Sequence, residues 1–131
     1  MLSSANSPLI DALHAVREWC EAREAFWTHR SNQAVRLREL RWQLKELLVW
    51  LELHDDQEEA ASRLDRAVEE LREKWWDFER ACESAAPRAV EEPRCREAAD
   101  VLLAAADKLA GVLEELSDEI PDSIWQGYGD V

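Results

Sequence analysis

Apolar residues recur along the chain at alternating spacings of three and four, the repeat that lines up side chains on one face of an α-helix. The clearest row predicts a helix over about 57–85. Its members are Ala61, Leu64, Val68, Leu71, Trp75, Phe78, Cys82 and Ala85. A similar row predicts a helix over about 93–118 and consists of Ala98, Leu102, Ala105, Leu109, Val112 and Leu116. Both rows are coiled-coil-like heptad seams, which indicates helices that pack lengthwise against their neighbours.

The N-terminal half predicts two further helices, over about 8–28 and 34–53. Ser7 can cap the first, and Pro8 suits its first position because the proline ring fixes a helical φ. The second has a seam of Leu37, Leu40, Leu44, Leu47 and Leu51, and its C-terminal half also contains Leu48, Val49, Trp50 and Leu53. We therefore expect that end to lie centrally in the fold. The polar segment 28–33 predicts a break between the two helices, but no Gly or Pro enforces it, so one continuous helix is the alternative.

Turn and loop signals separate the remaining helices. The segment HDD at 54–56 predicts a turn in which Asp55 or Asp56 caps the next helix. Two prolines mark the segment 86–94 as a loop, and Pro121 ends the last helix. We expect a single all-α domain over 1–131, an elongated antiparallel four-helix bundle with a short C-terminal tail at 119–131.

Composition agrees with this fold class and disfavours several functions. The 131 residues include only 3 Gly and 4 Pro, and 47% are apolar, which is enough for a helical core. The formal net charge of −13 opposes direct binding to nucleic acid or to an anionic membrane. The first ten residues lack the basic start of a signal peptide, and no apolar run approaches the roughly 20 residues of a membrane span. We therefore expect a cytoplasmic protein.

Charges are unevenly distributed between the two middle helices. Residues 30–51 contain five basic and two acidic side chains, which predicts a locally positive outer face on the second helix. In the third helix, Glu59 and Arg63, like Glu70 and Lys74, stand four residues apart, a spacing that favours ion pairs along one helix. The third helix is therefore expected to have a solvated outer face.

Two tryptophans fall outside the apolar rows. Trp76 follows the seam residue Trp75 and so lies about 100° around the helix, among the charged residues of the segment EKWWDFER. Trp42 likewise lies off the leucine seam of the second helix. Such an indole is either covered by its own chain or exposed as a contact for a partner, the role in which Trp is most enriched. The candidate contact residues are Trp42, Trp76 and Trp125, with Glu73 and Asp77 beside Trp76.

Five acidic residues gather near the end of the last helix, where no basic residue follows Lys108. They are Glu114, Glu115, Asp118, Glu119 and Asp122. Several stand at like-charge i,i+4 spacings, and the helix macrodipole disfavours negative charge at a C-terminus. The cluster is either an ordinary solvated helix end or a patch that meets a basic surface on another protein. In the extreme case its carboxylates imitate nucleic-acid phosphates.

No motif identifies a reaction. Cys20, Cys82 and Cys95 form no CxxC pair, and none of the three histidines stands at metal-ligand spacing, so we assign no catalytic, cofactor-binding or metal-binding residue and expect no cofactor. A disulfide between Cys82 and Cys95 is the less favoured alternative to buried thiols.

The sequence favours a non-catalytic protein–protein interaction module, such as an adaptor, an assembly subunit or an inhibitor. We expect its partner to be another protein with a basic surface, and a homodimer is the alternative. Two other functions stay open. One is an acidic nucleic-acid mimic that inhibits a DNA- or RNA-handling enzyme, and the other is an enzyme with an internal polar pocket.

Overall fold

The computed structural model describes residues 7–22, 27, 29–85 and 91–128, and these residues form four α-helices and no strand. The helices are α1 (Pro8–Glu21), α3 (Arg30–Glu52), α4 (Glu58–Ala85) and α5 (Pro93–Glu119). Two short 3-10 helices, η2 (Asp55–Gln57) and η3 (Asp122–Trp125), follow α3 and α5. The all-α fold class predicted from the apolar rows is confirmed.

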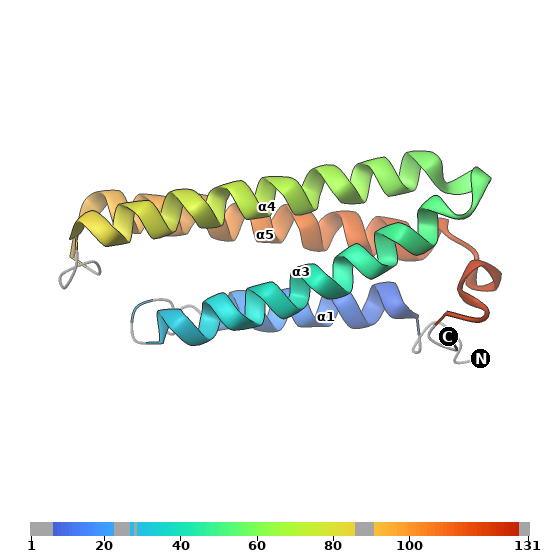
Figure 1. Ribbon diagram of the computed structural model, residues 1–131, viewed down its shortest axis with the longest axis horizontal. Coiled ribbons are helices and arrows are strands. Elements are labelled where there is room, and N and C mark those ends of the chain that lie inside the picture. The colour runs from blue at the N-terminus through green and yellow to red at the C-terminus, as the bar shows by residue number, and fades with distance from the viewer. Residues whose placement is uncertain (1–6, 23–26, 28, 86–90, 129–131) are drawn as a thin grey trace.

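The helices form a bundle in which each packs against the next in the chain, and α5 packs back on α1. Figure 1 shows α4 and α5 side by side along the length of the molecule, with α1 and α3 as a second layer. Successive helices are joined at alternate ends, so neighbours run antiparallel. The molecule is therefore an elongated antiparallel bundle, as the heptad seams predicted.

The first two helices have different bounds from those predicted. α1 ends at Glu21, whereas the apolar pattern predicted a helix to about residue 28; residues 23–26 and 28 lie outside the described part of the chain. α3 begins at Arg30, four residues before the predicted start. Its first turn is polar, so the apolar pattern carries no signal for it.

α1 and α3 are separate helices that pack on each other, so the alternative of one continuous helix is wrong. The indole Nε1 of Trp19 donates a hydrogen bond of 3.2 Å to the backbone oxygen of Gln33 in the first turn of α3. Gln33 is buried although it is polar, and its Oε1 accepts a hydrogen bond of 3.1 Å from Arg36. These contacts tie the end of α1 to the start of α3.

Helix-end signals act partly as predicted. Pro8 and Pro93 occupy the first positions of α1 and α5. Ser7 precedes α1 but makes no side-chain capping bond, and its backbone oxygen accepts the first helical hydrogen bond instead. Asp55 and Asp56 lie inside η2 rather than directly before α4, so the predicted aspartate cap is replaced by an extra turn.

The core combines residues from all four helices. On α4 the buried members of the predicted seam are Ala61, Leu64, Leu71, Trp75, Phe78 and Cys82. On α5 the buried face is wider than predicted and also includes Ala99, Ala106, Ala110 and Leu113. α5 contacts both α1 and α4, and two neighbours require a wider apolar face than a single seam supplies.

Aromatic rings from three parts of the chain meet inside the bundle. The rings of Trp19 and Trp75 pack with centroids 6.0 Å apart, which joins α1 to α4 across the core. The ring centroid of Phe78 lies 5.5 Å from that of Trp75, in a tilted geometry, and 5.8 Å from that of Trp27, in an edge-on geometry. Such rings each bury roughly 150–250 Å² and make a large contribution to the core.

Candidate functional site

Trp42 lies on the outer face of α3. The buried face of this helix is formed by its leucines, and Leu40 and Leu44 belong to it. Because each residue turns the helix by about 100°, Trp42 lies about 200° from both of these leucines. Trp42 is 66% exposed to solvent. The seam that folds α3 into the core therefore directs this indole away from the core.

Trp42 belongs to a row of exposed apolar residues along α3. Val35, Trp42 and Val49 are spaced by seven residues, and Leu53 follows one turn later. Seven residues turn the helix by about 700°, so residues at this spacing fall nearly in line. Val35 is 48%, Val49 49% and Leu53 69% exposed. The expectation that Val49 and Leu53 broaden a central seam is therefore wrong; these four residues are named the α3 row below.

Charged residues flank the α3 row, segregated by sign. Arg38 and Lys45 lie about 40–60° to one side of Trp42, and Glu39 and Glu46 lie at similar angles on the other side. All four charged side chains are exposed. Around Trp42 the outer face of α3 is therefore a narrow apolar strip with one basic and one acidic border. Beside Val49, the exposed Glu52 lies on the basic side. Sequence reasoning predicted a positive face and missed the strip, which its seven-residue spacing could have revealed.

Trp76 lies on the outer face of α4, although its neighbour in sequence lies in the core. Trp75 is 7% exposed, whereas Trp76 is 57% exposed. Trp76 lines an open depression whose other members are Arg72, Glu73, Asp77 and Arg80. Of the acidic members, Asp77 is paired with Arg80 and Glu73 is exposed. The ring stands among charged side chains, as its phase predicted. Of the two readings left open, covered or exposed, the structure shows the exposed one.

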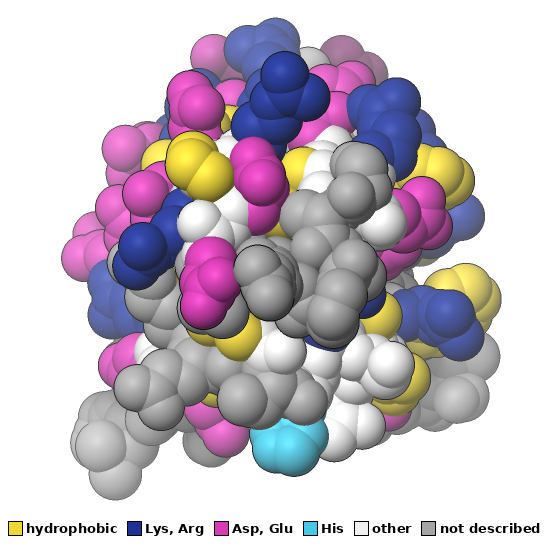
Figure 2. All heavy atoms as spheres, turned by 90° about the vertical axis from the view of Figure 1, so that its left-hand side faces the viewer, with side chains coloured by type: hydrophobic (Ala, Val, Ile, Leu, Met, Phe, Trp, Pro, Cys, Tyr) yellow, Lys and Arg dark blue, Asp and Glu magenta, His cyan; other side chains and the backbone are white. Residues whose placement is uncertain are grey.

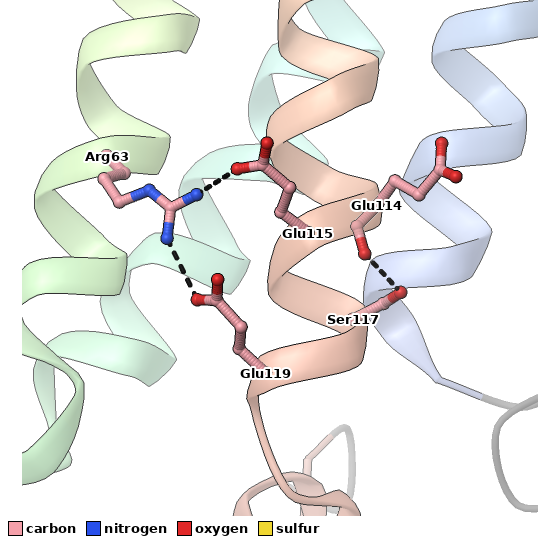
Figure 3. A network of polar contacts seen from close by, with 5 residues as sticks. All are labelled: Arg63, Glu114, Glu115, Ser117 and Glu119. Atoms are coloured by element: carbon pink, nitrogen blue, oxygen red, sulfur yellow. Dashed lines mark hydrogen bonds and ion pairs between the residues drawn. The ribbon is translucent and has the colours of Figure 1, made fainter.

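The acidic cluster at the end of α5 is compensated by arginines from other helices. Arg63 of α4 pairs with both Glu115 and Glu119, the latter at 3.0 Å, and Figure 3 shows the guanidinium lying between the two carboxylates. Glu114 pairs with Arg17 of α1 at 2.7 Å. These arginines come from positions 52 to 97 residues away along the chain. Glu114, Glu115 and Glu119 are therefore paired with arginines of the same molecule.

A further ion pair also joins α5 to a neighbouring helix. Glu70 of α4 pairs with Lys108 of α5 at 3.3 Å, so the ion pairs of α4 that involve Arg63 and Glu70 cross to α5 rather than follow the helix. Asp118 and Asp122 are exposed. Exposed ion pairs of this kind each contribute about 0–1 kcal/mol to stability.

Trp125 belongs to a tail that folds over the end of α3. The indole Nε1 of Trp50 donates a hydrogen bond of 2.7 Å to the backbone oxygen of Ile124 in η3. Tyr128 packs edge-on against Trp50 and Trp125, with ring centroids 5.5 Å apart in both pairs. Gly127 has a φ of 85°, a left-handed conformation that turns the chain back at this point. Trp125 is half-buried and packs against the core.

All three cysteines are free thiols, so the disulfide alternative is not formed. Cys82 and Cys95 are fully buried neighbours on α4 and α5, and Cys95 Sγ donates a hydrogen bond of 3.1 Å to the backbone oxygen of Ala81. Burial and the adjacent Cys82 raise the pKa of Cys95 to about 11, and burial and the charge of Asp107 raise the pKa of Cys20 to about 11. Because the thiolate is the reactive form, the raised pKa values lower the reactivity of Cys20 and Cys95 near neutral pH.

Within the described ranges, no group of three or more His, Cys, Asp and Glu side chains is arranged to hold a metal ion. None of the described helices combines the length and the apolar content needed to cross a lipid bilayer. No family model, curated protein or solved structure matches this chain. The two exposed indoles, Trp42 on α3 and Trp76 on α4, form the candidate site.

Proposed function

We propose that this protein is a non-catalytic protein-binding module that engages a partner through Trp42 on α3 and Trp76 on α4. The observation that carries the proposal is the exposure of both indoles on helices whose apolar seams already pack in the core. Trp is strongly enriched at the energetic centres of protein interfaces. An adaptor, an assembly subunit or an inhibitor acts in this way.

The free energy available from one exposed indole is substantial. A Trp side chain can bury roughly 200 Å², so covering the exposed two thirds of Trp42 contributes about 3 kcal/mol at about 25 cal/mol per Å². A basic surface on the partner adds attraction to the net charge of −13. This electrostatic attraction mainly speeds association, and it is screened beyond about 8 Å at physiological ionic strength.

The composition of the interior supports binding rather than catalysis. Ser7 and Gln33 are the polar residues among the described buried side chains. The backbone oxygen of Gln33 accepts a hydrogen bond from Trp19 and its Oε1 accepts one from Arg36, whereas its buried Nε2 has no hydrogen-bond partner among the described residues. Ser7 lies at the start of α1. The buried thiols Cys82 and Cys95 contact each other and backbone rather than a base. No described buried residue is an acid, a base or an activated nucleophile of the kind that catalysis requires.

An acidic nucleic-acid mimic that inhibits a DNA- or RNA-handling enzyme is the second candidate. It rests on the net charge and on the acidic cluster of α5. Three carboxylates of that cluster pair with arginines of the same molecule. At the end of the bundle seen in Figure 2, described acidic and basic side chains are also interspersed. A nucleic-acid mimic depends on uncompensated negative charge. The paired carboxylates and the interspersed charges therefore favour binding through the indoles over mimicry.

The proposal is tested by capture of partners from an extract of the native host. The purified chain is immobilised as wild type, as Trp42→Ala and as Trp76→Ala, and binding is compared at low and high salt. Val101→Ala on α5 is the matched control, because Val101 is also an exposed apolar residue, at 43%. Thermal melts of each variant establish that all four remain folded.

We expect proteins that bind to the wild type and to Val101→Ala but are lost with Trp42→Ala or Trp76→Ala. Retention at high salt indicates an apolar interface, whereas loss at high salt together with competition by DNA or RNA indicates the mimic. Identical capture by all four chains, or no specific capture at all, contradicts the proposal.

A further inference from the structure

We infer that a second copy of this chain pairs with the α3 row, and that the two α3 helices run parallel in the pair. The inference rests on the proposed function, because it assigns an occupant to the surface around Trp42. It follows from the linear arrangement of the apolar residues and from the segregation of charge beside them.

The α3 row follows the heptad repeat, with one apolar residue per repeat where a full coiled-coil seam has two. Val35, Trp42 and Val49 repeat every seven residues and span about 21 Å of the helix. In a parallel pair related by a twofold axis along the helices, each row residue meets its own counterpart, so indole packs on indole and valine on valine. The row lies opposite the core face of α3, so the rest of each bundle points away from the contact.

The charged borders of the row select the parallel orientation. In a parallel pair, the basic border of one helix faces the acidic border of the other. Arg38 then meets Glu39 of the second copy, and Lys45 meets Glu46, which gives four ion pairs by symmetry. The α3 surface is therefore complementary to itself.

An antiparallel pair has the opposite electrostatic consequence. A twofold axis perpendicular to the helices places each border against the same border of the other copy. Arg38 then faces Lys45, and Glu39 faces Glu46, so all the close contacts join like charges. The antiparallel pair is therefore disfavoured.

The size of the contact sets its strength. One helix face buries less than the roughly 800 Å² per partner of a standard stable interface, so we expect a weak dimer with a Kd of about 1 μM or higher. Two molecules of net charge −13 also repel each other at long range. This repulsion is screened beyond about 8 Å at physiological ionic strength, so association is expected to tighten as salt rises to that level.

The inference is tested by sedimentation velocity of the full chain from micromolar to near-millimolar concentration. We expect a concentration-dependent dimer, and we expect Trp42→Ala to raise its Kd at least about tenfold. Trp76→Ala is the matched control, because it removes the same exposed side chain from α4. A monomer at every concentration overturns the inference, and so does equal weakening by the two variants.

Charge reversal tests the pairing directly. R38E/K45E makes both borders acidic, and E39K/E46K makes both borders basic, so each double variant alone is expected to be monomeric. An equimolar mixture is expected to form a heterodimer, because opposite charges then meet again. All four positions are exposed, so circular dichroism is expected to show unchanged folding. A mixture that stays monomeric overturns the inference.

Crosslinking distinguishes the two orientations. Val35→Cys is expected to form an intermolecular disulfide under mild oxidation, since residue 35 meets itself only in the parallel pair. Val101→Cys on α5 is the control at a similarly exposed site. Crosslinking of Val35→Cys only when mixed with Val49→Cys overturns the parallel arrangement. A monomer that still captures a host protein through Trp42 overturns self-pairing and leaves the proposed function standing.

Discussion

Two adjacent tryptophans of α4 offer a matched pair of perturbations. Trp75→Ala and Trp76→Ala remove the same ring from the same turn of one helix, but the two rings point in directions about 100° apart. Trp75 packs against Trp19 and Phe78 in the core, whereas Trp76 is more than half exposed. The difference between their effects on stability therefore measures the phase of α4 directly.

The expected losses follow from burial. Trp75 is almost fully buried, and truncation of such a ring costs about 3–5 kcal/mol because a cavity remains. Trp76 buries less than half of a side chain of roughly 200 Å², which sets an upper bound of about 2 kcal/mol on its loss. Alanine returns about 0.5 kcal/mol through its higher helix propensity. We therefore expect Trp76→Ala to cost about 1 kcal/mol or less.

The assay is equilibrium unfolding in urea, followed by circular dichroism of the helical signal. Dichroism is preferable to fluorescence because the chain contains seven tryptophans. We expect the free energy of unfolding to fall at least about 2 kcal/mol further for Trp75→Ala than for Trp76→Ala. Equal losses, or a larger loss for Trp76→Ala, would show that the apolar phase of α4 has been assigned incorrectly.

Three further outcomes are expected. Arg63→Ala is expected to lower the free energy of unfolding by about 1 kcal/mol at low salt, because it removes two ion pairs with α5. The loss is expected to shrink in concentrated salt, and equal losses under both conditions contradict the ion pairs. Trp50→Phe keeps a ring but removes the hydrogen bond to η3, so amide exchange of the tail speeds up at a cost of about 1 kcal/mol; unchanged exchange contradicts this. Stability is expected to fall between about pH 9 and 11. The pKa values of Cys20 and Cys95 are raised to about 11 in the folded chain, so the unfolded chain loses these protons first. A free energy of unfolding that rises over this pH range, measured by urea titration, contradicts this.

The sequence alone predicted which face of each helix is buried, because that face depends only on the spacing of apolar residues within the helix. Leu64, Leu71 and Phe78 are buried as their spacing predicted, and Trp76 is exposed for the same reason. The prolines at 93 and 121 also bounded α5 correctly, because their effect is confined to neighbouring backbone. These features need no knowledge of the other helices.

Contacts between helices could not be predicted from the spacing of residues within one helix. Arg63 has Glu59 one turn before it, yet the structure pairs it with Glu115 and Glu119, which come close only when α4 and α5 pack. The apolar identity of Val49 suggested burial, although its angle from the leucine seam places it in solvent. Which charge is compensated depends on packing between distant segments, and neither composition nor local spacing contains that information.

The partial burial of Trp125 could not be predicted from the sequence either. The tail contains few apolar residues, and its position depends on one hydrogen bond from Trp50 and on edge-on ring contacts with Tyr128. Such contacts leave no periodic pattern in the sequence. Trp42 and Trp76, which are both more than half exposed, are therefore the indoles on which the proposed surface is built.

The most direct test of the central claim is the solvent accessibility of the indole N–H groups, measured by NMR on the dilute, ¹⁵N-labelled chain with a soluble paramagnetic agent. If the seams turn inward and leave Trp42 and Trp76 at the surface, the agent attenuates these two indole signals strongly and leaves those of Trp19 and Trp75 nearly unchanged. Signals of Trp42 and Trp76 that persist as well as that of Trp19 would contradict the claim.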